Sequence, residues 1–276
     1  MFVDLLRLLQ LDMKEPTAWG WYHLMCIGIV SLIIFVLYKM RHRHSETQLK
    51  VVLGIYAIIT MTLETLKQIS WSFSLDEISQ QIQFDYTWYS FPFQLCSTPM
   101  YVCLICLFLK KHKMRDCLLS YVAYITILGS LSAVFVPDTC FVNDILVNIH
   151  TVCLHYGGLV VSVYLLMSNE IPININYLKR GVCIFCIFTF LANMLNIIVY
   201  QSGIIADETF NMFYISPYFI SELPVFNTIQ QNVPYILFLF TYIIALSIGG
   251  WIIYTTAKMF KYLNQKHLFK KLIHKF

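Results

Sequence analysis

Long runs of apolar residues recur along the chain at intervals that suit membrane-spanning helices. A helix rises 1.5 Å per residue, so about 20 apolar residues cross the roughly 30 Å of hydrocarbon in a bilayer. Seven windows of this kind can be drawn, at residues 19–40, 51–71, 91–109, 117–136, 143–167, 181–200 and 234–256. The pattern predicts an all-α membrane protein with seven transmembrane helices.

The composition agrees with a membrane protein and argues against a soluble one. Hydrophobic residues make up 58% of the chain and charged residues 12%, and the mean hydropathy is +0.67. One soluble core cannot hide this much apolar surface. We expect an interfacial amphipathic segment at residues 1–18 and the transmembrane domain at 19–257. A basic cytoplasmic tail at 258–276 is then expected to bind anionic lipid.

Basic residues are distributed unevenly between alternate loops, which predicts the orientation, because lysine and arginine are retained on the cytoplasmic side of short loops. They follow the first, third, fifth and seventh windows, within residues 39–50, 110–115, 179–180 and 258–275. The other loops carry acidic residues such as Glu77, Asp138 and Glu208. We therefore place the N-terminus outside and the C-terminus inside, in a multi-pass protein of the cell membrane, and expect a bacterial plasma membrane. The net charge of +4 follows from this topology and indicates no nucleic-acid partner.

A few polar side chains interrupt the predicted spans, and most fall in the outer half of the membrane. Counted from the outer ends, they lie about 6 to 18 Å deep. They are Glu64, Lys67, Cys96, His150, His155, Asn193 and Asn196. Ionisable residues inside a membrane are costly and commonly functional. We expect these groups to gather in one cluster that opens toward the outer face.

Structural roles are open to two pairs within this set. Glu64 and Lys67 are three residues apart on one helix, so they can neutralise each other. Asn193 and Asn196 share a helix face, and interhelical hydrogen bonding is the usual role of asparagine in membranes.

Cys96 stands out among the cysteines because prolines flank it. Pro92 lies near the expected start of the third helix, and Pro99 cannot donate a helical hydrogen bond, so the helix should kink or open around Cys96. Backbone freed in this way must find polar partners, which favours a polar site. An imidazole can take the thiol proton, and the thiolate can then attack an acyl carbonyl. We predict that role for His155, whereas His150 lies about 140° away around the same helix and is not expected to serve the same site.

Two further cysteine pairs have the spacing of zinc or redox sites. They are Cys103 with Cys106, and Cys183 with Cys186. On apolar helices such pairs are more simply packing residues. We expect no metal and no coenzyme.

Several short motifs occur in a fixed order along most of the chain. They comprise Glu64 with Trp71, residues 91–96, Gly129, residues 135–138, His155, Asn193, residues 211–214 with Pro217, and Pro234 with Tyr235. Their order resembles the YwaF-like family of bacterial integral membrane proteins, which is related to a eukaryotic transmembrane acyltransferase that remodels ether phospholipids through a cysteine centre. The resemblance implies that Cys96 carries the acyl group and that His155 is its acid/base. In that family the segment that corresponds to residues 91–96 often reads Leu-Pro-Leu-His-Leu-Cys, and Gln94 replaces the histidine here. If the histidine helps to ionise the thiol in that family, Gln94→His should raise the activity of this protein.

The sequence and the resemblance together lead to the hypothesis of a lipid acyltransferase. The acyl group of a phospholipid would form a thioester on Cys96 and pass to a lysophospholipid, or to water in a hydrolase. Supporting or substrate-binding roles are assigned to Gln94, Glu64, Lys67, His150, Asn193 and Asn196. No obligate protein partner is evident. The alternatives are a transporter or ligand-sensing protein, in which the same polar groups form a pathway, and a structural subunit.

Overall fold

The computed structural model describes residues 2–41, 44–76, 81–137 and 140–273, with side chains described as far as residue 265. Three residues lie outside the described ranges although they contributed to the predicted orientation: Arg43 in the basic range 39–50, and the acidic Glu77 and Asp138. The last three residues of the chain also lie outside the described residues.

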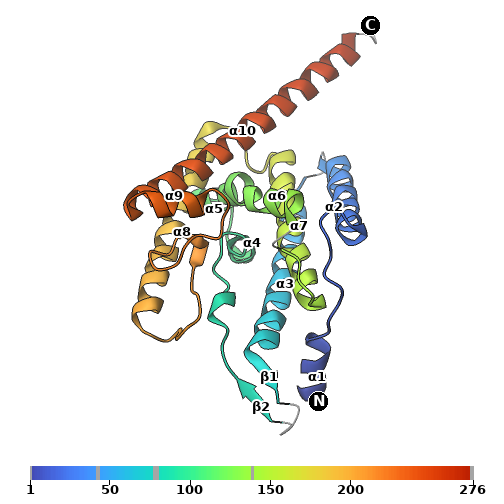
Figure 1. Cartoon of the computed structure of the whole chain (residues 1–276). Helices are drawn as coiled ribbons and strands as arrows, with labels where there is room; N and C mark the ends of the chain where they lie inside the picture. Colours follow the sequence, from blue (N-terminus) through green and yellow to red (C-terminus); the bar gives the residue numbers. More distant parts are fainter. Residues whose placement is uncertain (1, 42–43, 77–80, 138–139, 274–276) are drawn as a thin grey trace.

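Within the part of the chain that the structure describes, six helices are long and apolar enough to cross a membrane. They are α2 (Trp21–Met40), α3 (Glu46–Ser72), the continuous helix Lys113–Phe135, α7 (Ile145–Met167), α8 (Ile175–Gln201) and α10 (Tyr235–Ile273) (Figure 1). They confirm six of the seven predicted windows. The chain is therefore a multi-pass membrane protein.

The third window departs from the prediction of a continuous helix. Its helix, α4 (Thr98–Phe108), has 11 residues and is about 16 Å long, too short to cross a bilayer alone. The preceding residues 91–97 are irregular and follow a short 3-10 helix, η2 (Trp88–Ser90). Pro99 lies in the first turn of α4, where its missing N–H costs nothing. The predicted opening of the helix around Cys96 is confirmed, and the total of seven spans stays a prediction.

The shorter elements lie mainly at the ends of the long helices. They are α1 (Phe2–Leu9), the strands β1 (Phe73–Leu75) and β2 (Ile82–Phe84), the 3-10 helix η5 (Met212–Tyr214) and α9 (Phe226–Asn232). The two strands pair antiparallel, with Phe73 opposite Phe84. The apolar pattern did not predict this pair, because each strand has only three residues.

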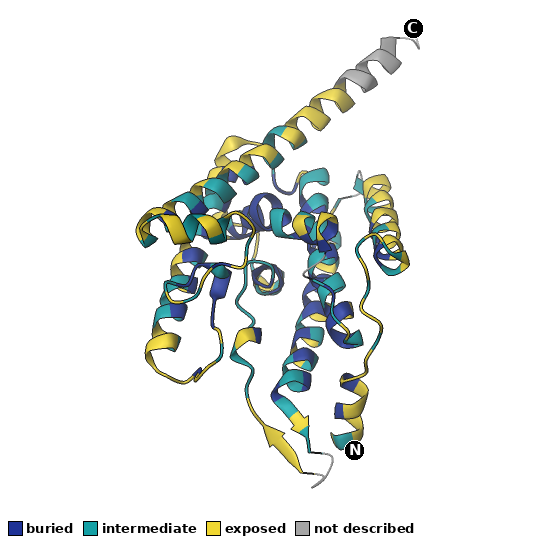
Figure 2. Ribbon diagram, viewed as in Figure 1, coloured by how far each residue is buried: buried dark blue, intermediate teal, exposed yellow. Residues whose placement is uncertain are grey.

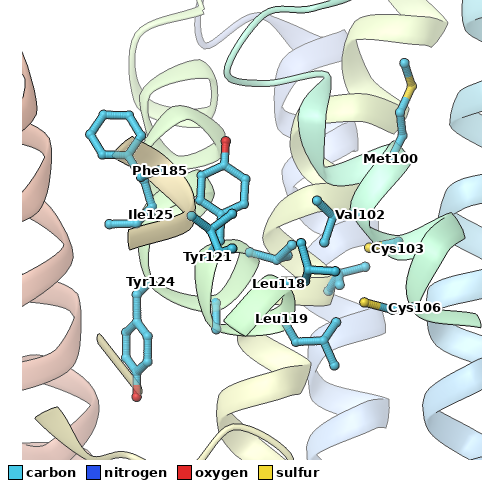
Figure 3. Packing of buried hydrophobic residues seen from close by; sticks show 14 of the residues in the cluster. Met100, Val102, Cys103, Cys106, Leu118, Leu119, Tyr121, Tyr124, Ile125 and Phe185 are labelled. Carbon is cyan, nitrogen blue, oxygen red and sulfur yellow. The ribbon is translucent and has the colours of Figure 1, made fainter. Parts of the chain in front are cut away.

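The continuous helix Lys113–Phe135 passes through the centre of the core (Figures 2 and 3). It consists of α5 (Lys113–Tyr121), a π-helical segment η3 (Val122–Thr126) and α6 (Ile127–Phe135). Wider π turns leave backbone groups in need of partners. The Val122 carbonyl accepts hydrogen bonds from the hydroxyls of Thr126 at 3.1 Å and of Ser162, on α7, at 2.8 Å. The π segment is therefore tied to a neighbouring helix.

One end of the bundle is held by an ion-pair network among three loops, here called the loop cluster. Arg115, which is fully buried, lies 2.5 Å from a carboxylate oxygen of Glu46 and 2.6 Å from one of Glu170. His44 Nε2 and Lys111 Nζ lie 3.0 Å and 3.7 Å from the other Glu170 oxygen. His44, Lys111 and Glu170 lie in the loops before α3, α5 and α8, and Glu46 and Arg115 lie in the first turns of α3 and α5. The loops that carry the basic residues of the sequence argument thus meet at one end.

The opposite end gathers the alternate loops. Gln10 donates from its side chain to the carbonyl of Ser70 at 2.8 Å, and Asp12 forms a β-bridge with Asp144. The backbone N–H of Tyr89 lies 3.4 Å from a carboxylate oxygen of Glu208, beyond the far end of α8. Figure 1 shows α1 and the strand pair at this end, while α10 projects past the other. Which end faces the cytoplasm stays a prediction.

Candidate active site

A second group of buried charges, here called the span cluster, joins α3 to α7. Glu64 Oε1 lies 2.8 Å from Lys67 Nζ, and Glu64 Oε2 lies 2.8 Å from His150 Nε2. Glu64 is 4% exposed, His150 5% and Lys67 9%. A charge buried in this way is tolerated only when it is paired and hydrogen-bonded. The predicted pairing of Glu64 with Lys67 is confirmed, and His150 joins it.

Gln68 links the span cluster to the chain that leads to Cys96. Its side-chain amide donates to Glu64 Oε1 at 2.8 Å and to the carbonyl of Ser90 at 2.7 Å. Ser90 ends η2, directly before the irregular segment. Gln68 was not among the predicted site residues, although its position four residues after Glu64 on the same helix could have suggested the contact.

Cys96 lies in the irregular segment, in a turn stabilised by its neighbours. The backbone N–H groups of Ser97 and Thr98 both donate to the carbonyl of Gln94, at 3.0 and 3.1 Å. Cys96 is half-buried and packs against the main core. The charged side chains that act electrostatically on its thiol are Lys67 and Glu64. The fold therefore brings Cys96 and the span cluster into one neighbourhood.

His155 lies on the part of α7 that faces α6. Its imidazole lies near the backbone of Gly129, on α6, and near His150 on its own helix. Its Nδ1 atom is buried and has no hydrogen-bond partner among the described residues. Within the described part of the chain, no hydrogen bond joins Cys96 to His155 or His150. His155 thus approaches the span cluster from the α6 side, through His150.

Gln94 does not pair with the thiol but holds the loop after α8. Its amide donates to the carbonyl of Asn211 at 3.0 Å and accepts from the N–H of Phe213 at 2.7 Å. Asn196 holds the peptide between them, since its amide donates to the Met212 carbonyl at 3.0 Å and accepts from the Met212 N–H at 2.7 Å. Phe213 has a positive φ of 58°, which is uncommon for a bulky residue. The two amides therefore fix a strained loop beside the Cys96 segment.

Asn193 makes the interhelical contact expected of asparagine in a membrane. The hydroxyl of Tyr235, at the start of α10, donates to Asn193 Oδ1 at 2.5 Å. The same hydroxyl is 2.7 Å from the carbonyl of Ile215. The interhelical role is confirmed for Asn193, whereas Asn196 binds the loop instead.

Tyr86 lies in the loop at the Glu64 end of the bundle. Burial raises the pKa of Tyr86, and the carboxylates of Glu64 and Glu208 raise it further. The phenol therefore stays neutral near physiological pH.

The fold and this constellation define a multi-pass membrane protein with a half-buried cysteine beside a buried ion cluster. The TMEM164 family model matches residues 17–254, which is most of the chain. The chain belongs to the TMEM164 family. TMEM164 is a eukaryotic ether-lipid acyltransferase family, so this part of the predicted resemblance is confirmed, and the YwaF-like part stays a prediction. No curated protein and no solved structure gave a match.

Proposed function

We propose that this protein is a membrane-embedded lipid acyltransferase in which Cys96 is the acyl-carrying nucleophile. The observation that carries the proposal is the position of Cys96, in the opened segment before α4 and within electrostatic reach of Lys67 and Glu64. The Lys67 ammonium favours the reactive thiolate, whereas burial and the Glu64 carboxylate oppose it, so the proposed reaction needs a base to take the thiol proton. Membership in a family associated with ether-lipid acyl transfer supports the same activity.

The proposed reaction has two acyl transfers. Cys96 Sγ attacks the ester carbonyl of a phospholipid, the ester C–O bond breaks, and the thiol proton passes through a base to the leaving alcohol. The hydroxyl of a lysophospholipid then attacks the thioester, and the thiol is regenerated. With water as the acceptor, the same steps give hydrolysis.

His155 remains our proposed acid/base. His150 Nε2 makes no hydrogen bond of good geometry, but it lies 2.8 Å from Glu64 Oε2, so an ion pair with that carboxylate occupies this side of the ring. The buried Nδ1 of His155 has no partner among the described residues and can accept a proton. Glu64 and Lys67 would set the local charge, while Gln94, Asn193 and Asn196 would hold the surrounding backbone in place. The substrates would enter from the lipid phase, and the basic tail would lie on anionic headgroups.

The test uses purified protein in phosphatidylcholine vesicles with an isotope-labelled acyl chain and a 1-alkyl lysophospholipid as acceptor. Mass spectrometry would follow both the product lipid and the acylated Cys96 peptide. We expect Cys96→Ala to abolish both signals, and Cys96→Ser to be severely impaired because an alcohol is much less ionised than a thiol. Cys186→Ala, which removes another half-buried cysteine, is the matched control and should keep full activity. Full transfer by Cys96→Ala would eliminate the covalent mechanism.

The span cluster favours one alternative function from a different class. Buried ionisable residues in membranes also mark ion and proton pathways. A transporter built on Glu64, Lys67 and His150 would move protons or a charged solute across sealed vesicles and would keep that activity in Cys96→Ala. A vesicle assay with an internal pH-sensitive dye distinguishes the two functions.

A further inference from the structure

Tyr242, on α10, has a hydroxyl with no hydrogen-bond partner among the described residues, although the side chain is 0% exposed. Two other buried tyrosines in this protein do have partners. The hydroxyl of Tyr121 lies 2.7 Å from that of Thr98, and the hydroxyl of Tyr56 donates to the carbonyl of Leu154 at 3.2 Å. A buried polar group without a partner costs free energy, so it needs an explanation.

The ring of Tyr242 is held firmly by aromatic neighbours. The ring centroids of Phe226, Phe185 and Phe238 lie 5.2, 6.0 and 6.5 Å from its own. Such packing fixes the position of the phenolic oxygen while leaving its hydrogen free to turn. The donor is therefore preorganised.

The surroundings connect this hydroxyl to the nucleophile. Phe185, which packs on Tyr242, lies one turn before Phe188 on α8, and the ring of Phe188 packs against that of Phe93, three residues before Cys96, with centroids 6.2 Å apart. Tyr242 belongs to the main core cluster, and Cys96 packs against that cluster. Thr189 lies four residues after Phe185 on α8, and its buried hydroxyl also has no described partner. α8 and α10 thus each carry a buried hydroxyl that has no described partner.

We propose that Tyr242 is an oxyanion donor, whose hydroxyl binds the carbonyl oxygen of the acyl group that Cys96 attacks. This inference rests on the proposed acyl transfer. When Sγ bonds to the carbonyl carbon, the C=O electron pair moves to oxygen, and a fixed donor stabilises that charge more than it stabilises the substrate. Collapse restores the C=O bond as the ester C–O bond breaks. Tyr242 keeps its proton throughout.

Two other tyrosines provide matched controls. Tyr156 is also buried with an unpartnered hydroxyl, but it packs in a separate cluster with Cys26, Val30 and Val134. Tyr121 also lies near the Cys96 segment, but its hydroxyl is already engaged, 2.7 Å from that of Thr98, two residues after Cys96. Tyr156→Phe therefore tests the loss of an unsatisfied hydroxyl away from the thiol, and Tyr121→Phe tests the loss of a satisfied hydroxyl near it.

The experiment measures the single-turnover rate of Cys96 acylation in the same vesicles, together with the melting temperature in detergent. Tyr242→Phe should slow acylation by about 10²-fold, the usual effect of removing one oxyanion donor, with little change in KM. Its melting temperature should stay unchanged or rise, because an unsatisfied hydroxyl is lost. Tyr156→Phe should acylate at the wild-type rate. Tyr121→Phe should melt lower and lose less than tenfold in rate.

Each contrary outcome has a separate meaning. If Tyr242→Phe acylates at the wild-type rate while Cys96→Ala is inactive, the role of Tyr242 is overturned and the proposed function stands. A Tyr242→Phe protein that is slow but also melts well below the wild type would show a structural role instead. Equal losses in Tyr156→Phe and Tyr242→Phe would also refute the oxyanion role. Full transfer by Cys96→Ala would remove the proposed function, and this inference with it.

Discussion

The loop cluster and the span cluster are both built around a carboxylate that pairs with several cations, but their surroundings differ. In the loop cluster, Arg115 is fully buried, whereas the side chains of Glu46 and Lys111 are 48% and 66% exposed. In the span cluster, no side chain is more than 11% exposed. The first network reaches water and fastens three loops. The second has little access to water and lies beside a cysteine, so its charges act strongly on nearby groups.

The largest expected contrast between the two ends is their accessibility. A cysteine introduced at Ser74 should react with a membrane-impermeant maleimide from outside intact cells, and one introduced at Lys113 should react only after the cells are opened. The reason is the retention of basic loops in the cytoplasm. The measurement is the maleimide labelling of each variant minus that of the native cysteines in the unmodified protein. The reverse pattern would mean that the span cluster lies in the cytoplasmic half of the membrane.

The next contrast lies within the site, between its two histidines. His155→Ala should lower acyl transfer by about 10² to 10⁴-fold, the usual contribution of general-base assistance. His150→Ala should reduce the rate far less, but it should lower the melting temperature because Glu64 loses a partner. Transfer rates and melting curves of the two variants measure this contrast. A larger rate loss in His150→Ala would make His150 the base.

The two central carboxylates offer a direct comparison of the clusters. Glu64→Gln and Glu170→Gln each leave buried cations short of a partner, and breaking such pairs typically costs about 3–5 kcal/mol. Both variants should therefore unfold more easily in detergent. Only Glu64→Gln is expected to change the rate of Cys96 acylation in the protein that remains folded. An equal rate loss in both would mean that the span cluster contributes stability alone.

The smallest expected effect concerns Gln94. Gln94→Leu removes both hydrogen bonds to the loop and should cost about 1–3 kcal/mol of stability, at 0.5–1.5 kcal/mol per bond. A neutral imidazole also carries one donor and one acceptor, so Gln94→His should retain most of that stability. Because the amide faces the loop, we expect the rate of Gln94→His to stay near the wild type. A clear rise would instead support thiol ionisation from this position.

The sequence predicted features that depend on local chemistry. Window length located the six long helices, Pro99 predicted the opening at Cys96, and the spacing of Glu64 and Lys67 predicted their ion pair. Each of these follows from residues close together in the chain.

Contacts between distant segments were beyond such reasoning. The hydrogen bonds of Gln94 join residues more than 100 positions apart. Tyr242 is one of 18 tyrosines, and only packing distinguishes it from those whose hydroxyls are satisfied. No local pattern carries that information.

The π-helical segment between α5 and α6 also determines how far α6 is rotated about the helix axis relative to α5. A π turn contains one more residue than an α turn, and each residue of an α-helix turns the chain by about 100°. The segment therefore determines which side chains of α6 face α7, where His155 meets Gly129. Deleting one residue from Val122–Thr126 would rotate all of α6 relative to α5, even if every remaining residue kept its identity. Insertions and deletions here should be tolerated far less than in the loops, because they would misalign the α6 wall of the site at a distance.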